Sequence, residues 1–520
     1  MSAGRRLLEP VYIINGTKRL EKLDDIRVTY SGLLGLAVSM GGMIAGLAFT
    51  IIVTRQLSPE EFGVWAIIGS MLSYSVISES IISYWTTRQV ARGKPVAKTS
   101  VISSSFFAGG SIPIYLLSIY LFTTNVQPTF FDSLLLGAIL IPITFIQGAL
   151  GAVNMGHKPH ALSVGMAVHQ ALKIPMGFAL VFSLGLGLDG ALLTVFVAQI
   201  GHLFIQLRYA LPLLRVSISI SYLRGWIRQS WLPLYNRTPG VLHDLDILLY
   251  TMITGSVLGP AYFAAAFVIA KVVGRAGAAS QAIYPKLLAK GTQEHITENL
   301  ALLMYFALPL LTLTILFSYH IMFLLNPEYA VAWMVGIILA LITFMRTIYG
   351  FTRQVLAGLD DVDVEENPSL SALLHSKLFR LATIENIYHM VYLGILALFL
   401  YMFLGQPDIQ LVWVWSLVSL AVTTPYLLYH VILTRRHTNF RTPYRRIFRY
   451  MGGVAGMVVV FLVTNDTIVV FDESIYVYLP RLLLEVAICC TTYLGITYAI
   501  DRKTRRLIKL IFSEMASWTR

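Results

Sequence analysis

The sequence predicts an all-α integral membrane protein of about 14 transmembrane helices. Of its 520 residues, 56% are hydrophobic and only 13% are charged, whereas soluble domains carry about a quarter charged residues. Apolar runs of roughly 20 residues recur from Ser31 to Ile500, the length that a helix needs to cross about 30 Å of hydrocarbon. Most of the basic residues lie between these runs. A water-soluble fold is therefore excluded.

Each apolar run is expected to form one span, and polar or proline-containing turns separate successive runs. The predicted spans are 31–54, 62–86, 101–123, 133–153, 161–184, 190–210, 239–258, 261–284, 299–318, 330–350, 381–404, 411–433, 447–463 and 475–500.

Lysine and arginine set the orientation, because short cytoplasmic loops hold an excess of both. They gather in alternate loops, around 88–98, 208–237 and 435–449, and in both tails, while the opposite loops are acidic. Both termini are then cytoplasmic. The tail 501–520 alternates bases with apolar residues, which is typical of a helix lying against anionic lipid. The net charge of +12 therefore needs no nucleic acid.

An internal repeat divides the chain. The turn Arg55–Trp65 follows the first span and the turn Gly255–Phe263 follows the seventh, and each combines a proline with an aromatic residue. We expect two pseudo-symmetric lobes of six helices plus two C-terminal helices. The predicted parts are a cytoplasmic tail (1–30), an N-lobe (31–210), a cytoplasmic linker (211–238), a C-lobe (239–433, with an acidic inner loop at 354–379), helices 13 and 14 (434–500) and a basic interfacial tail (501–520).

These turns resemble those of the polysaccharide exporters and lipid-linked oligosaccharide flippases of the multidrug/oligosaccharidyl-lipid/polysaccharide superfamily. Similar proteins carry Leu-Gly-Pro-Glu-Glu-Tyr-Gly at the first outer turn, and Leu57–Gly63 departs from it only at Ser58 and Phe62. Leu258-Gly259-Pro260, Pro285 and Asn326–Tyr329 fit the same pattern; the acidic residues Asp360, Asp361, Asp363, Glu365 and Glu366 look like an insertion. The resemblance implies alternating access and translocation of an isoprenoid-pyrophosphate-linked glycan or similar glycolipid.

Cations inside predicted spans are the candidate substrate-binding residues, because a charge in the bilayer is costly unless it faces a cavity or a partner. His169 and Lys173 lie four residues apart in span five, and Lys271 and Arg275 repeat that spacing in span eight. Each pair shares a helix face. Such cations suit a pyrophosphate head. The alternative is pairing with an intramembrane acid, and a helix-contact role for His169 is an equal alternative.

Acids inside spans are candidates for binding a coupling ion or a proton, foremost Glu79 and Asp246. Asp244 and Glu485 are further candidates, with helix pairing favoured for Glu485. Arg346, Glu385 and Arg88 are expected to reach the inner interface. No glycine-rich phosphate loop ending in Lys-Ser or Lys-Thr occurs, which argues against ATP hydrolysis. We expect no catalytic residue, no metal site and no cofactor.

The first hypothesis is a multi-pass plasma-membrane flippase that moves a lipid-linked saccharide to the outer leaflet, with anionic lipids and glycan-assembly enzymes as partners. A cation-coupled antiporter of the same superfamily is the alternative within transport. A membrane glycosyltransferase is the alternative from another class, since Asp244–Asp246 and Asp361–Asp363 mimic a metal-binding acid pair.

Overall fold

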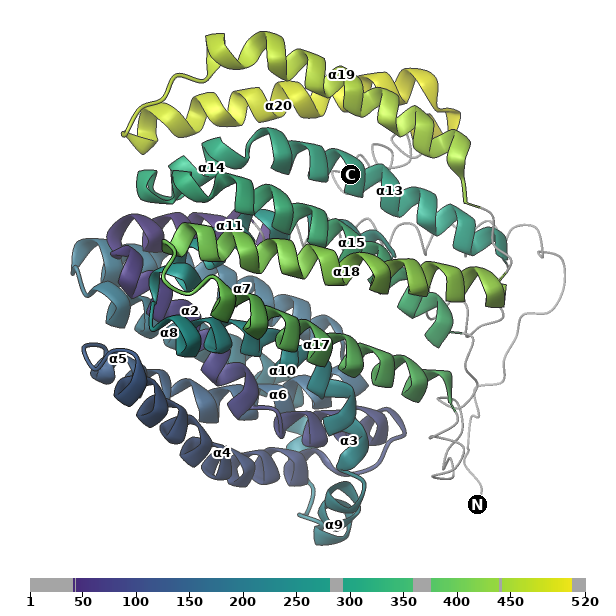
Figure 1. The fold of residues 1–520 in the computed structure, drawn as a ribbon. Helices are drawn as coiled ribbons and strands as arrows, with labels where there is room; N and C mark the ends of the chain where they lie inside the picture. The colour runs from purple at the N-terminus through teal and green to yellow at the C-terminus, as the bar shows by residue number, and fades with distance from the viewer. Residues whose placement is uncertain (1–40, 43, 281–292, 359–375, 439–441, 507–520) are drawn as a thin grey trace, which may run out of the picture.

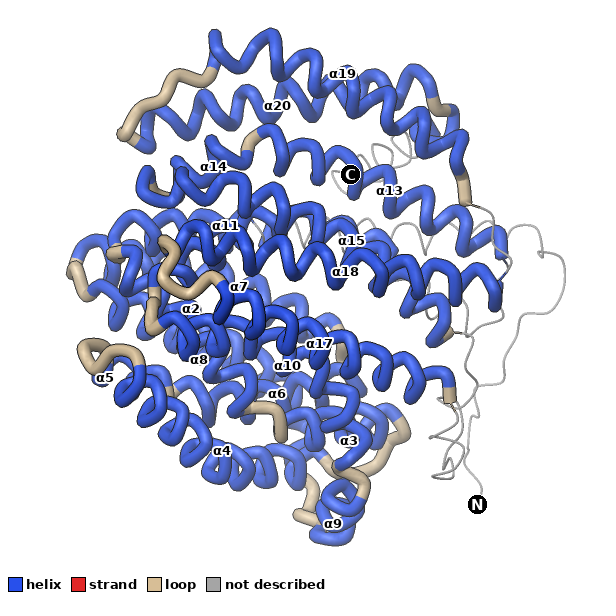
Figure 2. Tube along the Cα trace, in the orientation of Figure 1, coloured by secondary structure: helices blue, strands red, loops and turns tan. Residues whose placement is uncertain are grey.

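The computed structural model describes residues 41–42, 44–280, 293–358, 376–438 and 442–506. Within these ranges the chain forms helices and no strand (Figure 2). Among the described residues, eleven helices are long and apolar enough to cross a membrane, or twelve if a bent pair is counted as one span. The chain is a multi-pass membrane protein. The predicted tail 1–30, Pro285, the acidic residues 360–366 and the tail beyond 506 lie outside the described residues.

The N-lobe occupies the purple and blue part of the chain (Figure 1). Its helices are Ile44–Gln56, α2 (Pro59–Ser75), α3 (Glu79–Ala91), α4 (Ala97–Asn125), α5 (Phe131–Gly137), α6 (Leu140–His157), α7 (His160–Gly177), the π-helix η1 (Phe178–Ser183) and α8 (Gly187–Ala210). Ser58 begins α2 with a capping box, in which Glu61 bonds back to the Ser58 amide, so the predicted turn motif is also a helix start. The pair α2 and α3 is bent by 59°.

The C-lobe follows two short helices, η2 (Leu211–Arg215) and α9 (Ile220–Arg228). It contains α10 (Trp231–Thr254), α11 (Leu258–Gly274), η3 (Arg275–Ser280), α13 (Gln293–Leu316), α14 (Ser318–Leu325), η4 (Pro327–Ala332), α15 (Trp333–Ala357), α17 (Lys377–Met402) and α18 (Asp408–Thr438). Helix α10 thus begins inside the segment predicted as a linker. Helix 44–56 and α10 fall on predicted spans one and seven, in addition to the twelve spans above.

The last two helices, α19 (Tyr444–Ile468) and α20 (Ile475–Ile500), form an antiparallel pair that packs on the α13–α14 side of the C-lobe (Figure 1). The Tyr493 hydroxyl donates to the Tyr305 carbonyl at 2.7 Å across this contact. Glu485 is fully buried between the two helices, where it accepts a hydrogen bond from Thr464 at 2.7 Å. This position fits the helix-pairing interpretation of Glu485.

The two predicted repeat turns meet in space. A Cβ atom placed on Gly63 of α2 would lie 2.0 Å from the Val257 carbonyl oxygen, and one on Gly259 of α11 would lie 2.1 Å from the Tyr250 ring. Only glycine permits so close an approach. The motif glycines therefore serve the packing of the turns against each other and against α10.

Hydrogen bonds reinforce the same contact between the lobes. The Thr54 hydroxyl shares its hydrogen between the Leu325 carbonyl at 3.0 Å and the Thr50 carbonyl of its own helix at 2.9 Å. Arg55 Nε donates to the Leu324 carbonyl at 2.9 Å. Asn326 Nδ2 returns a bond to the Thr54 carbonyl at 3.1 Å. We call this contact, comprising Thr54, Arg55, Gly63, Val257 and 324–326, the outer seam, because it lies at the predicted outer ends of the spans.

Candidate functional site: a cationic space between the lobes

One predicted cation from each lobe lies near enough to the other for their charges to interact. Lys173 extends from α7 of the N-lobe and Lys271 from α11 of the C-lobe, and their positive charges repel each other. Each ammonium also lies over an aromatic ring, Lys173 at 5.5 Å from the Phe49 centroid and Lys271 at 4.8 Å from that of Phe267. Rings of this kind hold a cation in place without neutralising it.

Lys271 is exposed, although the neighbouring residues Ala270 and Val273 of α11 are fully buried. Its ammonium interacts with Lys173 of the opposite lobe and is attracted by Asp244 of α10. A side chain that interacts with residues of both lobes lies at the boundary between them. The structure thus brings Lys173 and Lys271 together at this boundary.

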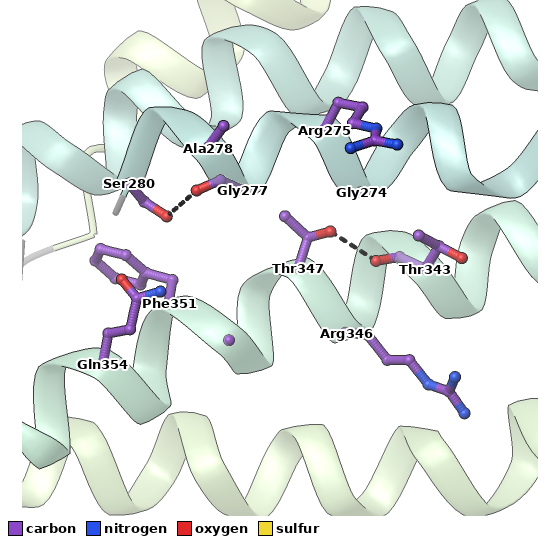
Figure 3. A pocket seen from close by; sticks show the side chains of 11 residues that line it. Gly274, Arg275, Gly277, Ala278, Ser280, Thr343, Arg346, Thr347, Phe351 and Gln354 are labelled. Carbon is purple, nitrogen blue, oxygen red and sulfur yellow. Dashed lines mark hydrogen bonds between the residues drawn. The ribbon is translucent and has the colours of Figure 1, made fainter. Parts of the chain in front are cut away.

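Arg275 lies one turn beyond Lys271, at the start of η3. With Arg346 of α15 it lines a cavity of about 360 Å³ between η3 and α15 (Figure 3). The other lining residues are Gly274, Gly277, Ala278, Ser280, Thr343, Thr347, Gly350, Phe351 and Gln354. Arg346, expected to reach the inner interface, instead donates from Nη1 to His243 Nε2 of α10 at 2.5 Å.

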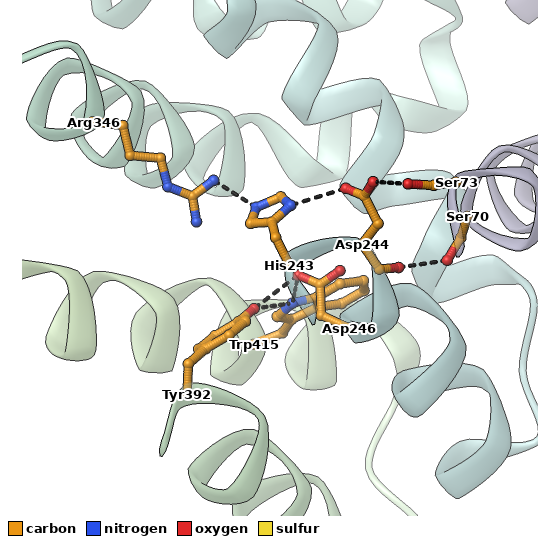
Figure 4. A network of polar contacts seen from close by, with 8 residues as sticks. All are labelled: Ser70, Ser73, His243, Asp244, Asp246, Arg346, Tyr392 and Trp415. Atoms are coloured by element: carbon orange, nitrogen blue, oxygen red, sulfur yellow. Dashed lines mark hydrogen bonds and ion pairs between the residues drawn. The ribbon is translucent and has the colours of Figure 1, made fainter. Parts of the chain in front are cut away.

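A polar chain runs from Arg346 across the boundary between the lobes (Figure 4). His243 Nδ1 lies 3.0 Å from Asp244 Oδ1, and the other carboxylate oxygen of Asp244 accepts a hydrogen bond from Ser73 of α2. Ser70, also on α2, donates to the Asp244 backbone carbonyl. Side chains of α15 and α10 in the C-lobe are thereby connected to α2 in the N-lobe.

Asp246, a predicted coupling acid, lies on the other side of α10 and is buried within the C-lobe. Its Oδ2 accepts hydrogen bonds from Tyr392 at 2.9 Å and Trp415 at 3.3 Å (Figure 4). Trp415 also stacks on Phe263 with 3.8 Å between centroids. A buried carboxylate needs such donors, so this arrangement stabilises α10 against α17 and α18. A role in ion coupling stays a prediction.

Glu79, the other predicted coupling acid, begins α3 directly after the bend in the N-lobe. It accepts a hydrogen bond from Ser83 and is attracted by Arg237 of α10. A helix N-terminus favours a negative charge. The carboxylate packs against α6, where a Cβ atom on Gly148 would lie 2.0 Å from Oε1. A role of Glu79 in ion coupling also stays a prediction.

His169 lies between α7 and α8, with its ring 6.0 Å from the ring of His202. His202 in turn bonds to Gln147 at 2.8 Å and to Gln206 at 3.0 Å. This is the position expected of a helix-contact histidine. Within the described ranges, no three residues of the metal-ligating types lie close enough to hold a metal ion.

Sequence reasoning missed His243, Ser70 and Ser73 as parts of the site. Two signals in the sequence could have indicated them. His243 directly precedes Asp244 inside a span, and Ser70 and Ser73 are three residues apart, hence on one face of a helix. Their partners lie 174 and 171 residues away along the chain, so only the fold shows the contact.

No protein-family model matches the sequence, and no curated protein matches it. Solved structures do match. The lipid II flippase MurJ in an inward closed conformation has a TM-score of 0.64 at 14% identity, over 91% of this chain and 99% of that one. An inward-facing multidrug resistance MATE family transporter of the MOP superfamily has a TM-score of 0.58 at 12% identity, over 78% and 98%.

An outward-facing MATE family transporter of the MOP superfamily also matches, with a TM-score of 0.53 at 14% identity, over 81% of this chain and 99% of that one. At such identities the likeness concerns the fold. This chain therefore shares the helical fold of these solved structures.

Proposed function

We propose that this chain is a transporter of the plasma membrane that flips an isoprenoid-pyrophosphate-linked saccharide from the cytoplasmic to the outer leaflet by alternating access. The observation that carries the proposal is the pair Lys173 and Lys271, contributed by different lobes and repelling each other across a shared space. Two like charges held close together repel each other, and an anion between them offsets that repulsion. A pyrophosphate supplies that anion.

The contacts between the lobes support an inward-facing state. The outer seam joins the predicted outer ends of the lobes, and the bonds from Ser70 and Ser73 to Asp244 join them again farther along α2. A substrate would then enter from the inner leaflet. Export of an anion is favoured by an inside-negative potential at about 2.3 kcal/mol per charge per 100 mV, so this step needs no ATP.

The test is flipping of a labelled lipid-linked saccharide in proteoliposomes. The double variant Lys271→Ala/Arg275→Ala removes two charge-assisted contacts, each of which contributes about 1.5–3 kcal/mol, or roughly tenfold to a hundredfold in binding. We expect flipping to be lost, and Arg275→Lys to retain part of it because a point charge replaces the bidentate fork. Lys158→Ala, an exposed lysine of the α6–α7 turn, is the matched control. Wild-type flipping by the double variant would contradict the assignment.

The same preparation separates the alternatives. A cation-coupled small-molecule antiporter is disfavoured for cationic cargo by the lysines at the shared space, because a positive surface repels such cargo. It would show efflux of a cationic dye that depends on an ion gradient. A membrane glycosyltransferase would release a glycosylated product. Glycan-assembly enzymes and anionic lipids remain the proposed partners.

A further inference from the structure

We propose that a phosphoanion bound between η3 and α15 releases a latch between the two lobes by withdrawing Arg346 from His243. The latch consists of Arg346, His243, Asp244, Ser73 and Ser70 (Figure 4). The inference rests on the proposed function only in taking pyrophosphate as the chemistry of the ligand.

The hydrogen bonds of the latch all have a fixed direction. A guanidinium only donates, so His243 Nε2 must accept from Arg346, and the imidazole is neutral with its proton on Nδ1. That Nδ1–H donates to Asp244 Oδ1 at 3.0 Å. A carboxylate only accepts, so the Ser73 hydroxyl donates to Oδ2. Arg346 therefore orients His243, and His243 fixes the carboxylate that holds the N-lobe.

The cavity beside Arg346 has the chemistry of an anion site. Among its described lining residues, Arg275 and Arg346 are cationic and none is acidic. Its volume of about 360 Å³ falls in the range of small-ligand pockets. At its other end, Gln354 Oε1 is buried and has no hydrogen-bond partner among the described residues, so a hydroxyl group of a bound sugar would satisfy it.

Arg346 belongs to both the cavity and the latch, and this makes the two uses compete. In Figure 3 its side chain extends from α15 away from Arg275, and its Nη1 bonds to His243 of α10. To hold an anion together with Arg275, the guanidinium must turn back toward η3. The bond to His243 is then broken. His243 then loses the hydrogen bond that fixed its ring. The Asp244 carboxylate is in turn attracted by Lys271.

Because the two uses of Arg346 compete, substitutions in the cavity and in the latch should change the affinity for pyrophosphate in opposite directions. Arg346→Ala removes an anion contact, so pyrophosphate binding should weaken by roughly tenfold or more. His243→Ala and Ser73→Ala remove only the competing bonds, so both should bind pyrophosphate more tightly than wild type and favour separated lobes without ligand, as linkage requires. A merely structural role for His243 would weaken binding or leave it unchanged.

The experiment uses the full chain in nanodiscs, with Cys489 and Cys490 replaced by alanine and spin labels at Thr124 and Gln406. Both labelled residues are exposed, near the predicted outer ends of α4 and α18. Binding is measured with inorganic pyrophosphate and, separately, with an isoprenyl pyrophosphate lipid. The proposal is supported if either ligand binds and the distance between the two labels lengthens. If only the isoprenyl pyrophosphate lipid has this effect, the phosphoanion is a lipid headgroup; if inorganic pyrophosphate suffices, it is the free anion. Ser105→Ala, an exposed serine outside the latch, is the control.

Binding of neither ligand, or weaker binding by both His243→Ala and Ser73→Ala, would overturn the latch. If Arg346→Ala does not fold, Ser73→Ala still decides the sign. Failure of the proposed function is distinguishable from failure of the latch. A chain that does not flip lipid-linked saccharides, yet shows tighter pyrophosphate binding in the two latch variants, retains the latch and loses only the substrate assignment.

Discussion

The outer seam and the latch both join the N-lobe to the C-lobe, but by different chemistry. The seam relies on close backbone packing at Gly63 and on side chains that bond to backbone carbonyls. The latch combines charged side chains with two serine hydroxyls, and most of its groups can rotate. A carbonyl cannot withdraw unless its whole helix moves, whereas a side chain can. The seam therefore fixes the geometry of the closed state, and the latch controls when that state is left.

The largest effect is expected from Gly63→Ala. The added Cβ would meet the Val257 carbonyl oxygen at 2.0 Å, and backbone cannot move aside as a flexible side chain can. Overpacking of this kind costs about 1–3 kcal/mol, which shifts a two-state equilibrium by roughly fivefold to over a hundredfold. The Thr124–Gln406 label distance should lengthen without ligand. Gly69→Ala on the same helix meets open space and should leave the distance unchanged; equal behaviour of the two variants would refute the seam.

Asp246→Asn tests whether Asp246 stabilises the C-lobe alone or also takes part in the contact between the lobes. The amide keeps the shape but provides a weaker acceptor for Tyr392 and Trp415 and places an unmatched donor nearby, at a cost of about 1–3 kcal/mol. We expect a lower Tm with unchanged label distances. A shift in the distances at constant Tm would mean that Asp246 takes part in the lobe movement.

Thr54→Val should weaken the outer seam less than Gly63→Ala does. It keeps the side-chain shape and removes the hydroxyl that is shared between the Leu325 carbonyl and the Thr50 carbonyl of its own helix, at a cost to the seam of up to about 1 kcal/mol. The fraction of molecules with separated outer ends should rise severalfold in the label-distance distribution. Thr50→Val, whose hydroxyl bonds only to the Gly46 carbonyl of its own helix, is the control. If the two variants give the same distribution, Thr54 does not hold the seam.

The smallest effect concerns Asp501, which lies beyond α20 and outside both contacts. Burial would raise the pKa of its carboxyl, but hydrogen bonds from Thr504 and the ion pair with Arg449 at 3.0 Å outweigh it, and the pKa lies below its ordinary value. Asp501 thereby caps the helical turn that follows it, because its Oδ2 accepts hydrogen bonds from the amide and the hydroxyl of Thr504. Such a cap contributes about 1 kcal/mol. This stability is present above the unfolded pKa of about 3.9 and is lost as pH falls through the lowered folded value.

Hydrogen exchange of residues 502–506 should therefore accelerate in the wild type as pH falls below about 4, beyond the intrinsic effect of pH. Asp501→Asn should abolish this acceleration and leave the lobe distances unaltered. An identical pH dependence in both proteins would show that Asp501 does not stabilise the turn.

Much of the fold could be predicted from the sequence because bilayer thickness imposes one length on every span. The repeat of Leu57–Gly63 and Leu258–Pro260 also indicated two lobes, and the structure shows why glycine stands in each. The start of α10 at Trp231 was harder to predict from the sequence, because Arg237 and His243 interrupt the apolar run by which a span is recognised. Its polar residues are the ones that contact Arg346, Ser70 and Ser73.

The candidate site was only partly predictable. Charges within spans identified Lys173, Lys271 and Arg275, because their cost in lipid is independent of the fold. The contact partner of a charge depends on which helix faces which. For this reason Arg346 was assigned to the interface although it bonds to His243, and Asp246 was not expected between Tyr392 and Trp415.

Label distances at both ends of the molecule test the central claim most directly, that the lobes alternate around the cationic space. The outer pair is Thr124 and Gln406, and the inner pair is Lys94 and His437, which are likewise exposed. Upon addition of a lipid-linked saccharide in nanodiscs, the account predicts a population in which the outer distance is longer and the inner distance shorter than without substrate. Distances that stay constant, or that change in the same direction at both ends, would contradict it.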